Sequence, residues 1–289
     1  KRQLLNGFES LCFDKNLIKI RNKLISEERL DFNDAKAIME TQDINSLGIL
    51  SSSVKEKMHG KKVYFVVNRH INPSNVCAIS CKFCAFGKPK GHSDAYEMSM
   101  EKILSLVSNE LKEIHIVGGL HPDWKFEKYL EIVREVSKAA PDAHIKAFTA
   151  VEIDWFSQIS GKSVSKVISD LMNAGVDALP GGGAEIFSPE VRKKICTPKT
   201  TGDSWLEIHR EAHKQGLPSN ATILYGHLES YDDVIDHVSR LRDLQDDTNG
   251  FFAFIPVLFQ PFNTRLSKVK PFPFSYDLKI HSLARLYLD

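Results

Sequence analysis

The chain has 289 residues, which is long enough for one α/β barrel or for two domains of average size. Its net charge of +1 gives no sign of a nucleic-acid-binding face or an acidic tail. The longest apolar stretch, 251–259, is short and contains Pro256, and no apolar stretch follows the first charged residues. We therefore expect a cytoplasmic protein with no membrane-spanning helix, no secretory signal, and neither membrane nor nucleic acid as a partner.

Residues 1–60 predict helices, because Leu17, Ile20 and Leu24 share one helical face and Asn33 is placed to begin a short helix. From residue 61 onward, strands alternate with amphipathic helices. One helix is expected to begin near Ser99 and the last near Ser275. The expected strands cover 63–67, 113–117, 144–149, 176–179, 219–225 and 251–257.

Six strand–helix units in series predict an α/β fold of parallel strands. We expect an N-terminal helical extension (1–60) followed by a full or partial (β/α) TIM-type barrel (61–289). No Gly-x-Gly-x-x-Gly follows the first strand, which argues against a dinucleotide-binding sheet. The chain does not begin with Met and ends directly after a predicted helix, so we expect that its true start and a C-terminal portion are missing.

Three of the five cysteines lie within eight residues, as Cys77-x3-Cys81-x2-Cys84 on the loop after the first predicted strand. Such a loop can bind three irons of a cubane cluster and leave the fourth iron open to a small molecule, whereas electron-carrier clusters normally have four cysteine ligands. Two alternatives stay open: a zinc site completed by His70 or His92, and three unrelated buried cysteines. Cys12 and Cys196 lie outside this loop.

The cysteine spacing, with an aromatic before the last cysteine, resembles the radical S-adenosylmethionine (radical SAM) superfamily. The resemblance continues after the second strand in 115–122, after the third in 146–153, after the fourth in 179–187 and after the fifth in 225–229. Together these segments are similar to the aminodeoxyfutalosine synthases of menaquinone biosynthesis.

This resemblance implies a [4Fe-4S] cluster, S-adenosylmethionine as co-substrate, and a one-electron donor such as flavodoxin or ferredoxin. The implied reaction is a C–C bond-forming transfer, in which a 5′-deoxyadenosyl radical adds to 3-[(1-carboxyvinyl)oxy]benzoate, an aromatic dicarboxylate. Rearrangement and loss of carbon dioxide or bicarbonate would then give 6-amino-6-deoxyfutalosine.

The resemblance also implies roles for individual residues. Cys77, Cys81 and Cys84 would bind iron, and four residues would contact S-adenosylmethionine: Phe83, Gly118, Gly119 and Glu152. Candidates for substrate binding lie at the expected mouth of the barrel: His70, Asn72, Gly181, Gly182 and Gly183. Further rim residues that could meet a carboxylate are Arg69, His121, Arg192 and His227. His209 and His213 lie on one helix face without a metalloprotease glutamate, so we expect them on the exposed barrel exterior.

Three other functions compete with this interpretation. The dehypoxanthine futalosine cyclase, another radical SAM enzyme of the same pathway, shares the cysteine motif and the Gly-Gly-Gly-Ala-Glu block. The radical enzyme of deazaflavin synthesis is a second relative, which the three glycines argue against. From another class, a non-catalytic iron–sulfur or zinc-binding protein would use the cysteines without S-adenosylmethionine.

Overall fold

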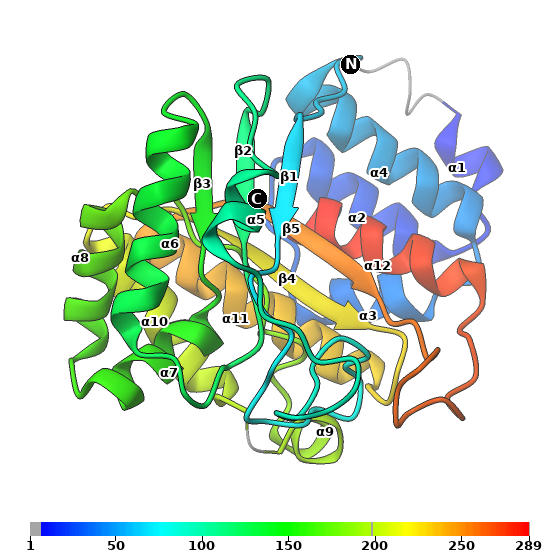
Figure 1. The fold of residues 1–289 in the computed structure, drawn as a ribbon. Helices are drawn as coiled ribbons and strands as arrows, with labels where there is room; N and C mark the ends of the chain where they lie inside the picture. The colour runs from blue at the N-terminus through cyan, green and yellow to red at the C-terminus, as the bar shows by residue number, and fades with distance from the viewer. Residues whose placement is uncertain (1–6, 198, 289) are drawn as a thin grey trace.

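The computed structural model describes residues 7–197 and 199–288. Two short parallel sheets form its centre (Figure 1). The first is built from β1 (Asn68–Ile71), β2 (Glu113–Ile116) and β3 (His144–Ala147), in that order, and the second from β4 (Ser219–Tyr225) and β5 (Phe251–Leu258). Single bridges from Lys146 to Ala178 and from Leu179 to Ser219 connect the sheets. The strands therefore form a partial barrel, with β1 and β5 at its two edges, and the predicted α/β class is confirmed.

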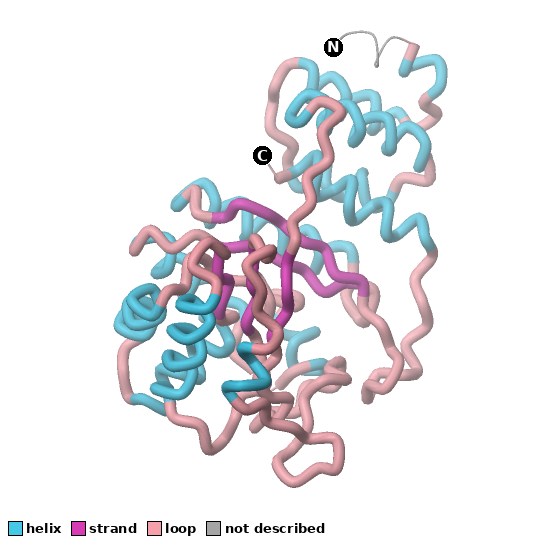
Figure 2. Tube along the Cα trace, turned by 45° about the horizontal axis from the view of Figure 1, so that its top comes forward, coloured by secondary structure: helices cyan, strands magenta, loops and turns pink. Residues whose placement is uncertain are grey.

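Helices cover the outside of this curved wall, and long loops gather at the end where the strands finish (Figure 2). Helix α6 shows why: its Phe126, Tyr129, Leu130 and Val133 are buried at helical spacing, and they pack on the sheet in one hydrophobic cluster. The outer helices are α5 (Met100–Leu104), α6 (Phe126–Ala139), α7 (Ala150–Ser160), α8 (Val164–Ala174), α9 (Pro189–Ile195), α10 (Gly202–Lys214), α11 (Tyr231–Thr248) and α12 (Phe274–Tyr287).

Four helices precede the first strand: α1 (Phe8–Leu11), α2 (Lys15–Ile25), α3 (Phe32–Glu40) and α4 (Ile44–His59). Asp31, not the expected Asn33, begins α3 in a capping box with Asp34. Helices α3 and α4 pack against α12 (Figure 1), so Ile38 and Leu47 share a second hydrophobic cluster with Leu283. The N-terminal helices and the barrel therefore share buried apolar surface.

The expected strand at 63–67 is wrong. Val63 and Phe65 are 84% and 90% exposed, and the first strand begins only at Asn68. Ile114 and Ile116 of β2 are buried, and this burial sets the register in which they pair with Arg69 and Ile71 of β1. In this register Asn68 lies opposite Glu113, the first residue of β2, so the apolar residues 63–67 lie before the paired part of the two strands.

Two further expectations need correction. Residues 150–160 and 189–195 are helices α7 and α9, which the sequence pattern did not predict. His209 is fully buried rather than exposed: its Nδ1 and the Nε2 of His213 lie 2.7 and 2.8 Å from the hydroxyl of Ser219. Burial lowers the pKa of both histidines, that of His213 to about 4. Both rings are therefore neutral where they form hydrogen bonds with Ser219. No helix in the described ranges combines the length and apolarity needed to cross a bilayer.

Candidate functional site

A cavity of about 520 Å³ lies at the carboxyl ends of the strands. The three clustered cysteines line it from one side. The ends of β2 and β3 contribute Gly118, Gly119 and Glu152, and more distant segments contribute Gly183, Lys199 and Arg265. Catalytic residues of barrel enzymes lie at this end of the strands, which makes the cavity the candidate active site.

Backbone hydrogen bonds hold the cysteine loop from several directions. The N–H of Ala78 donates to Leu120 O across 2.8 Å, which attaches the loop to the segment after β2. The N–H of Lys82 donates to Ile195 O at the end of α9 across 2.7 Å, and Lys82 O accepts from Arg265 N across 2.9 Å. The loop between the cysteines is therefore tied to three separate parts of the barrel.

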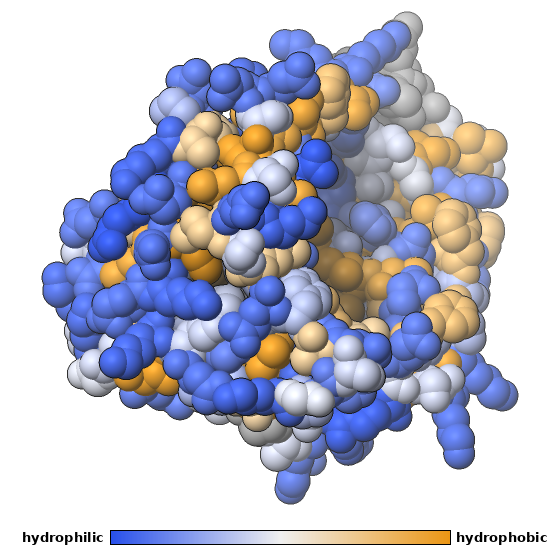
Figure 3. All heavy atoms as spheres, viewed as in Figure 1, coloured by the Kyte–Doolittle hydropathy of each residue, from blue (hydrophilic) through white to orange (hydrophobic). Residues whose placement is uncertain are grey.

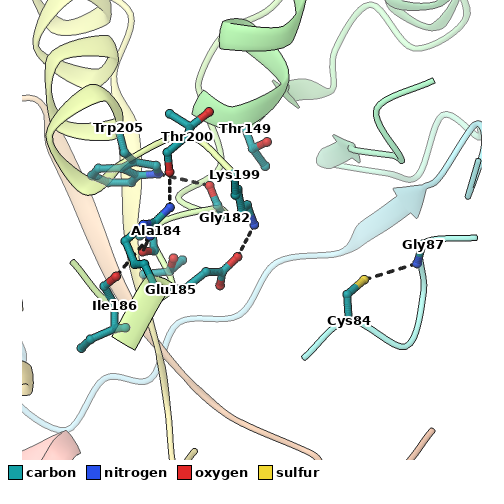
Figure 4. Close-up of polar contacts among 12 residues, drawn as sticks. Cys84, Gly87, Thr149, Gly182, Ala184, Glu185, Ile186, Lys199, Thr200 and Trp205 are labelled. Carbon is teal, nitrogen blue, oxygen red and sulfur yellow. Dashed lines mark hydrogen bonds and ion pairs between the residues drawn. The ribbon is translucent and has the colours of Figure 1, made fainter. Parts of the chain in front are cut away.

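The surroundings of the thiols fit an iron–sulfur cluster. None of the cysteines forms a disulfide, and the N–H groups of Leu120 and Gly87 point at Cys77 Sγ and Cys84 Sγ, at 3.4 and 3.3 Å. Figure 4 shows the contact between Gly87 and Cys84. A Cβ atom on Gly87 would lie 3.3 Å from Cys77 Cβ and 3.7 Å from Cys84 Sγ, in space that the glycine leaves free. Such N–H donors to sulfur tune cluster ligands.

The two histidines considered as a fourth zinc ligand, His70 and His92, have other contacts. In the described part of the chain, no three His, Cys, Asp or Glu side chains converge closely enough to bind a single ion. His92 lines the cavity, but its Nδ1 accepts from Asp94 N across 3.0 Å, and His70 packs against His115 instead. Cubane ligands are spaced more widely, because each binds a different iron.

Lys199 adds a buried positive charge beside the cysteine loop. Its ammonium pairs with Glu185 and lies 5.2 Å from the ring centroid of Phe83 (Figure 4 shows the ion pair). Burial disfavours this charge, but Glu185 and Cys81 outweigh burial and raise the pKa of Lys199. Burial also raises the pKa of the Cys81 thiol to about 12, and the Lys199 charge opposes that rise. Lys199 therefore favours negative charge at Cys81.

Glu152, which the resemblance places in contact with S-adenosylmethionine, is buried. It is the third residue of α7, and its carboxylate accepts from the N–H and hydroxyl of Thr149 at 2.9 and 2.7 Å, and from Gly118 N at 2.8 Å. Burial raises the pKa of Glu152 to about 7, against the opposing effect of these hydrogen bonds. Glu152 thus connects the end of β2 to the start of α7 and lines the cavity.

Gly118 and Gly119 allow the cysteine loop to pack directly on the end of β2. A Cβ atom on Gly119 would lie 2.2 Å from Val76 O, and one on Gly118 would lie 3.0 Å from Ser74 O. Both glycines line the cavity. The close approach of the loop backbone therefore requires glycine at both positions, independently of any contact with a ligand in the cavity.

The three successive glycines have different surroundings. Gly183, at φ +91°, lines the cavity. Gly181 and Gly182 are not among the lining residues: a Cβ on Gly181 would meet the backbone of β4, and Gly182 O accepts from the Trp205 indole across 3.2 Å (Figure 4). Substrate contact by these glycines stays a prediction, and for the first two the structure shows close packing of strand ends.

His70 and Asn72, two of the expected substrate-binding residues, have different surroundings. Asn72 donates from its side chain to Val117 O across 2.8 Å and so links the ends of β1 and β2. His70 is exposed on β1, with its ring centroid 4.5 Å from that of His115. Their role in substrate binding stays a prediction.

Three other rim candidates are engaged within the fold. Arg192 is buried and donates to the carbonyls of Ala184 and Ile186 and to Thr200 O. His121 stacks on Trp124, and His227 is buried in the loop after β4 beside Glu229. Arg69 points away from the neighbouring His70 on β1, by strand alternation, and is exposed.

The sequence analysis missed Lys199 and Arg265 as cavity residues. Both reach the cysteine loop from segments more than 100 positions later in the chain, through folding alone. A lysine among the basic residues 192–199 and an arginine in an irregular loop carry no periodic signal.

Comparison with known proteins agrees with this site. The family model "Radical SAM superfamily" matches residues 71–241. The chain is 42% identical to an aminodeoxyfutalosine synthase from Thermus thermophilus, over 96% of this chain and 76% of that one. A second aminodeoxyfutalosine synthase, from Streptomyces coelicolor, is 44% identical over 84% of this chain and 64% of its own length.

A 5-amino-6-(D-ribitylamino)uracil–L-tyrosine 4-hydroxyphenyl transferase from Methanopyrus kandleri is 41% identical, over 80% of this chain and 65% of that one. Among solved structures, the FeFe-hydrogenase maturase HydG from Carboxydothermus hydrogenoformans shares the fold, with a TM-score of 0.74 at 18% identity, over 99% of this chain and 66% of that one. The chain belongs to the radical SAM superfamily and, within it, to the aminodeoxyfutalosine synthase family.

Proposed function

We propose that this chain joins the adenosyl group of S-adenosylmethionine to 3-[(1-carboxyvinyl)oxy]benzoate, with rearrangement and loss of carbon dioxide or bicarbonate, to give 6-amino-6-deoxyfutalosine. The observation that carries the proposal is the cavity in which the three free cysteines face Gly118, Gly119 and Glu152. The similarity to two aminodeoxyfutalosine synthases supports the choice of reaction.

Cys77, Cys81 and Cys84 would hold the [4Fe-4S] cluster. The bound cluster and S-adenosylmethionine supply one-electron chemistry and the adenosyl radical. Lys199 would offset the negative charge of the cysteine thiolates, and the N–H groups of Gly87 and Leu120 would donate to the sulfurs.

The remaining residues would position the two substrates. Gly118 and Gly119 would form the cavity wall at the end of β2, where Glu152 accepts from the Gly118 N–H and holds that wall in place. The apolar side chains Phe83, Val151 and Leu120 line the same cavity and would shield a bound substrate from water. Alignment of the adenosyl carbon with the enol-ether double bond is the main contribution that such a rigid wall can make.

The electron donor is proposed to be a small one-electron carrier such as flavodoxin or ferredoxin. It would approach the side of the cavity where Lys82, Lys88 and the exposed Phe86 surround the cysteine loop, because acidic carriers are attracted by such basic side chains. We place the reaction in the cytoplasm, where thiols stay reduced.

The testing experiment is an anaerobic assay of the iron-loaded protein with S-adenosylmethionine and a reductant. Three substrates are offered separately: the enolpyruvyl benzoate, the cyclase substrate, and tyrosine with the ribitylaminouracil. We expect product only from the first. Turnover of either other substrate alone would assign the chain to the cyclase or to the transferase.

A further inference from the structure

A second set of polar side chains lies on the inner wall of the barrel, away from the cysteine loop. His70 on β1, His115 on β2 and Lys146 on β3 occupy paired positions in the strand register, so they form one row across three neighbouring strands. The alternate residues Ile114, Ile116 and Ile145 are buried against the outer helices. Because successive side chains alternate between faces, the row lies on the face opposite the helices, inside the barrel.

The row is charged and partly buried. The Lys146 ammonium is 2.7 Å from Glu113 Oε2, and His115 Nε2 is 2.5 Å from Glu113 Oε1. Burial would raise the pKa of Glu113, but the hydrogen bonds from His115 and Lys146 outweigh it and lower that pKa. The Lys146 side chain is only 6% exposed, so this cation lies in a region of low dielectric.

The Glu113 carboxylate satisfies only some of the hydrogen-bonding groups of His70, His115 and Lys146. An ammonium has three donors, and Glu113 takes one of those of Lys146. Within the described ranges, Nδ1 of His115 and both ring nitrogens of His70 have no hydrogen-bond partner. The row thus retains hydrogen-bonding atoms beside the Lys146–Glu113 ion pair, and the remaining donors of Lys146 could bind the oxygens of a second carboxylate.

An aromatic surface faces the same cation from the other side of the barrel. The Lys146 ammonium lies 4.5 Å from the ring centroid of Phe252 on β5. Phe252 is half exposed and also lines a cavity of about 420 Å³ between β5, the end of α4 and α12. Figure 3 shows that the molecule is hollowed on the side viewed, with hydrophobic residues inside the hollow. A flat apolar ligand could therefore lie on Phe252 while an anionic group meets Lys146.

We propose that His70, His115 and Lys146 form the subsite for the ring carboxylate of an aromatic acid, with Phe252 against the ring. The proposal rests on the proposed function and deepens it. The paired positions lie one residue before the ends of β1, β2 and β3, deeper than the cysteine cavity. The enol-ether end of the substrate must meet the adenosyl group near the cysteines, which leaves the benzoate end to extend inward.

The test pairs one variant with one substrate analogue. Lys146→Gln and the wild type are assayed, as iron-loaded protein, with the enolpyruvyl benzoate and with its analogue that lacks the ring carboxylate. In the wild type, loss of that carboxylate should lower kcat/KM by roughly 10- to 100-fold, as for a hydrogen bond to a charged group. In Lys146→Gln, removal of the ring carboxylate should lower kcat/KM by about threefold or less, because the lysine that binds this carboxylate is already absent. Equal losses in both proteins would overturn the subsite.

His144→Gln is the matched control. His144 lies two residues earlier on the same strand and face and is exposed, so the wild-type response to the analogue should persist. If Lys146→Gln does not fold, His70→Gln replaces it, because the His70 ring is exposed and engages no hydrogen bond in the described ranges. It should show the same non-additivity at a smaller size.

A binding measurement separates this proposal from the proposed function. Without turnover, 3-hydroxybenzoate and phenol are titrated against the wild type and Lys146→Gln, and binding is followed by ligand NMR. The wild type should bind the acid roughly 10-fold more tightly than phenol, and the variant should bind both alike. That result without turnover of the enolpyruvyl benzoate refutes only the proposed reaction. Turnover with equal binding of acid and phenol refutes only the subsite.

Discussion

The carboxylate of Glu152 accepts a hydrogen bond from the backbone N–H of Gly118 across 2.8 Å. One buried side chain thus fixes the end of β2 against the first turn of α7, directly beside the cysteine loop. The protonation state of Glu152 and the stability of its contact with Gly118 are therefore linked to the shape of the cavity.

Glu152 should make stability depend on pH. Its pKa rises from the ordinary 4.5 to about 7 on folding, so the folded chain binds more protons than the unfolded chain between these values. The contribution of Glu152 to the free energy of unfolding is therefore fully present below about pH 4.5, and it is lost as the pH rises toward 7. The difference in unfolding free energy between wild type and Glu152→Gln should shrink by about 1–3 kcal/mol from pH 5 to 7. Urea denaturation across this range measures it, and a difference independent of pH would contradict the prediction.

Iron content should depend on three cysteines only. Replacing Cys77, Cys81 or Cys84 by Ala removes a ligand, so each variant should lose iron, sulfide and turnover. Cys12→Ala and Cys196→Ala are the controls and should keep all three. Cys196 is the stricter control, because it is buried close enough to Cys81 to raise the pKa of that thiol. Iron loss in Cys196→Ala would make it a fourth ligand.

Gly119→Ala should displace the cysteine loop. The added Cβ would meet Val76 O at 2.2 Å, so backbone must move, at a cost of about 1–3 kcal/mol. We expect lower iron occupancy together with a lower melting temperature. Gly48→Ala in α4 is the matched control, since nothing lies within 4 Å of its Cβ, and it should stabilise the helix by about 0.5–1 kcal/mol. Unchanged iron in Gly119→Ala would mean that the loop tolerates the shift.

The Lys199–Glu185 pair should behave as one unit. Lys199→Met leaves a buried carboxylate unpaired, which should cost about 3–5 kcal/mol of stability. The double variant with Glu185→Gln should lose less than the two single variants together, because no buried charge remains unpaired. The exposed pair Lys138–Glu135 serves as comparison and should contribute at most about 0.5 kcal/mol. Additive losses at Lys199 and Glu185 would show that the pair is not coupled.

Isotope labelling separates the two enzymes of the futalosine route. In the proposed reaction the adenosyl group joins the substrate, so label in the adenine ring of S-adenosylmethionine should appear in a larger, benzoate-containing nucleoside. Methionine should be released in step with it, and free 5′-deoxyadenosine should be a minor by-product. Stoichiometric 5′-deoxyadenosine without a labelled adduct would leave a radical enzyme but exclude the synthase.

Local patterns predicted most of the fold. The strands β2 to β5 and the stop of α8 at Gly175 follow from apolar periodicity and from a glycine at φ +114°. The errors came from segments whose structure depends on distant partners. The run 63–67 has strong strand propensity but precedes the first paired position of β1 and β2, which is Asn68 opposite Glu113. Thr149 to Glu152 continues a strand pattern while forming a capping box.

The same distinction holds for the site. The three cysteines are adjacent in sequence, so their spacing alone predicted a cluster loop. Lys199 and Arg265 reach that loop only because α9 and the loop after β5 pack on it. Burial of Glu152 likewise follows from how α7 meets β2, which no local pattern contains.

The peptide of Lys82, between two of the proposed iron ligands, has a consequence for the dynamics of the protein. Its N–H is bonded to Ile195 O, and its carbonyl accepts from Arg265 N. Opening of the cysteine loop therefore breaks contacts at two distant segments at once. Amide hydrogen exchange at Lys82 and Arg265 should slow together when iron is loaded, so that assembly of the metal site also sets the order of the segment after β5.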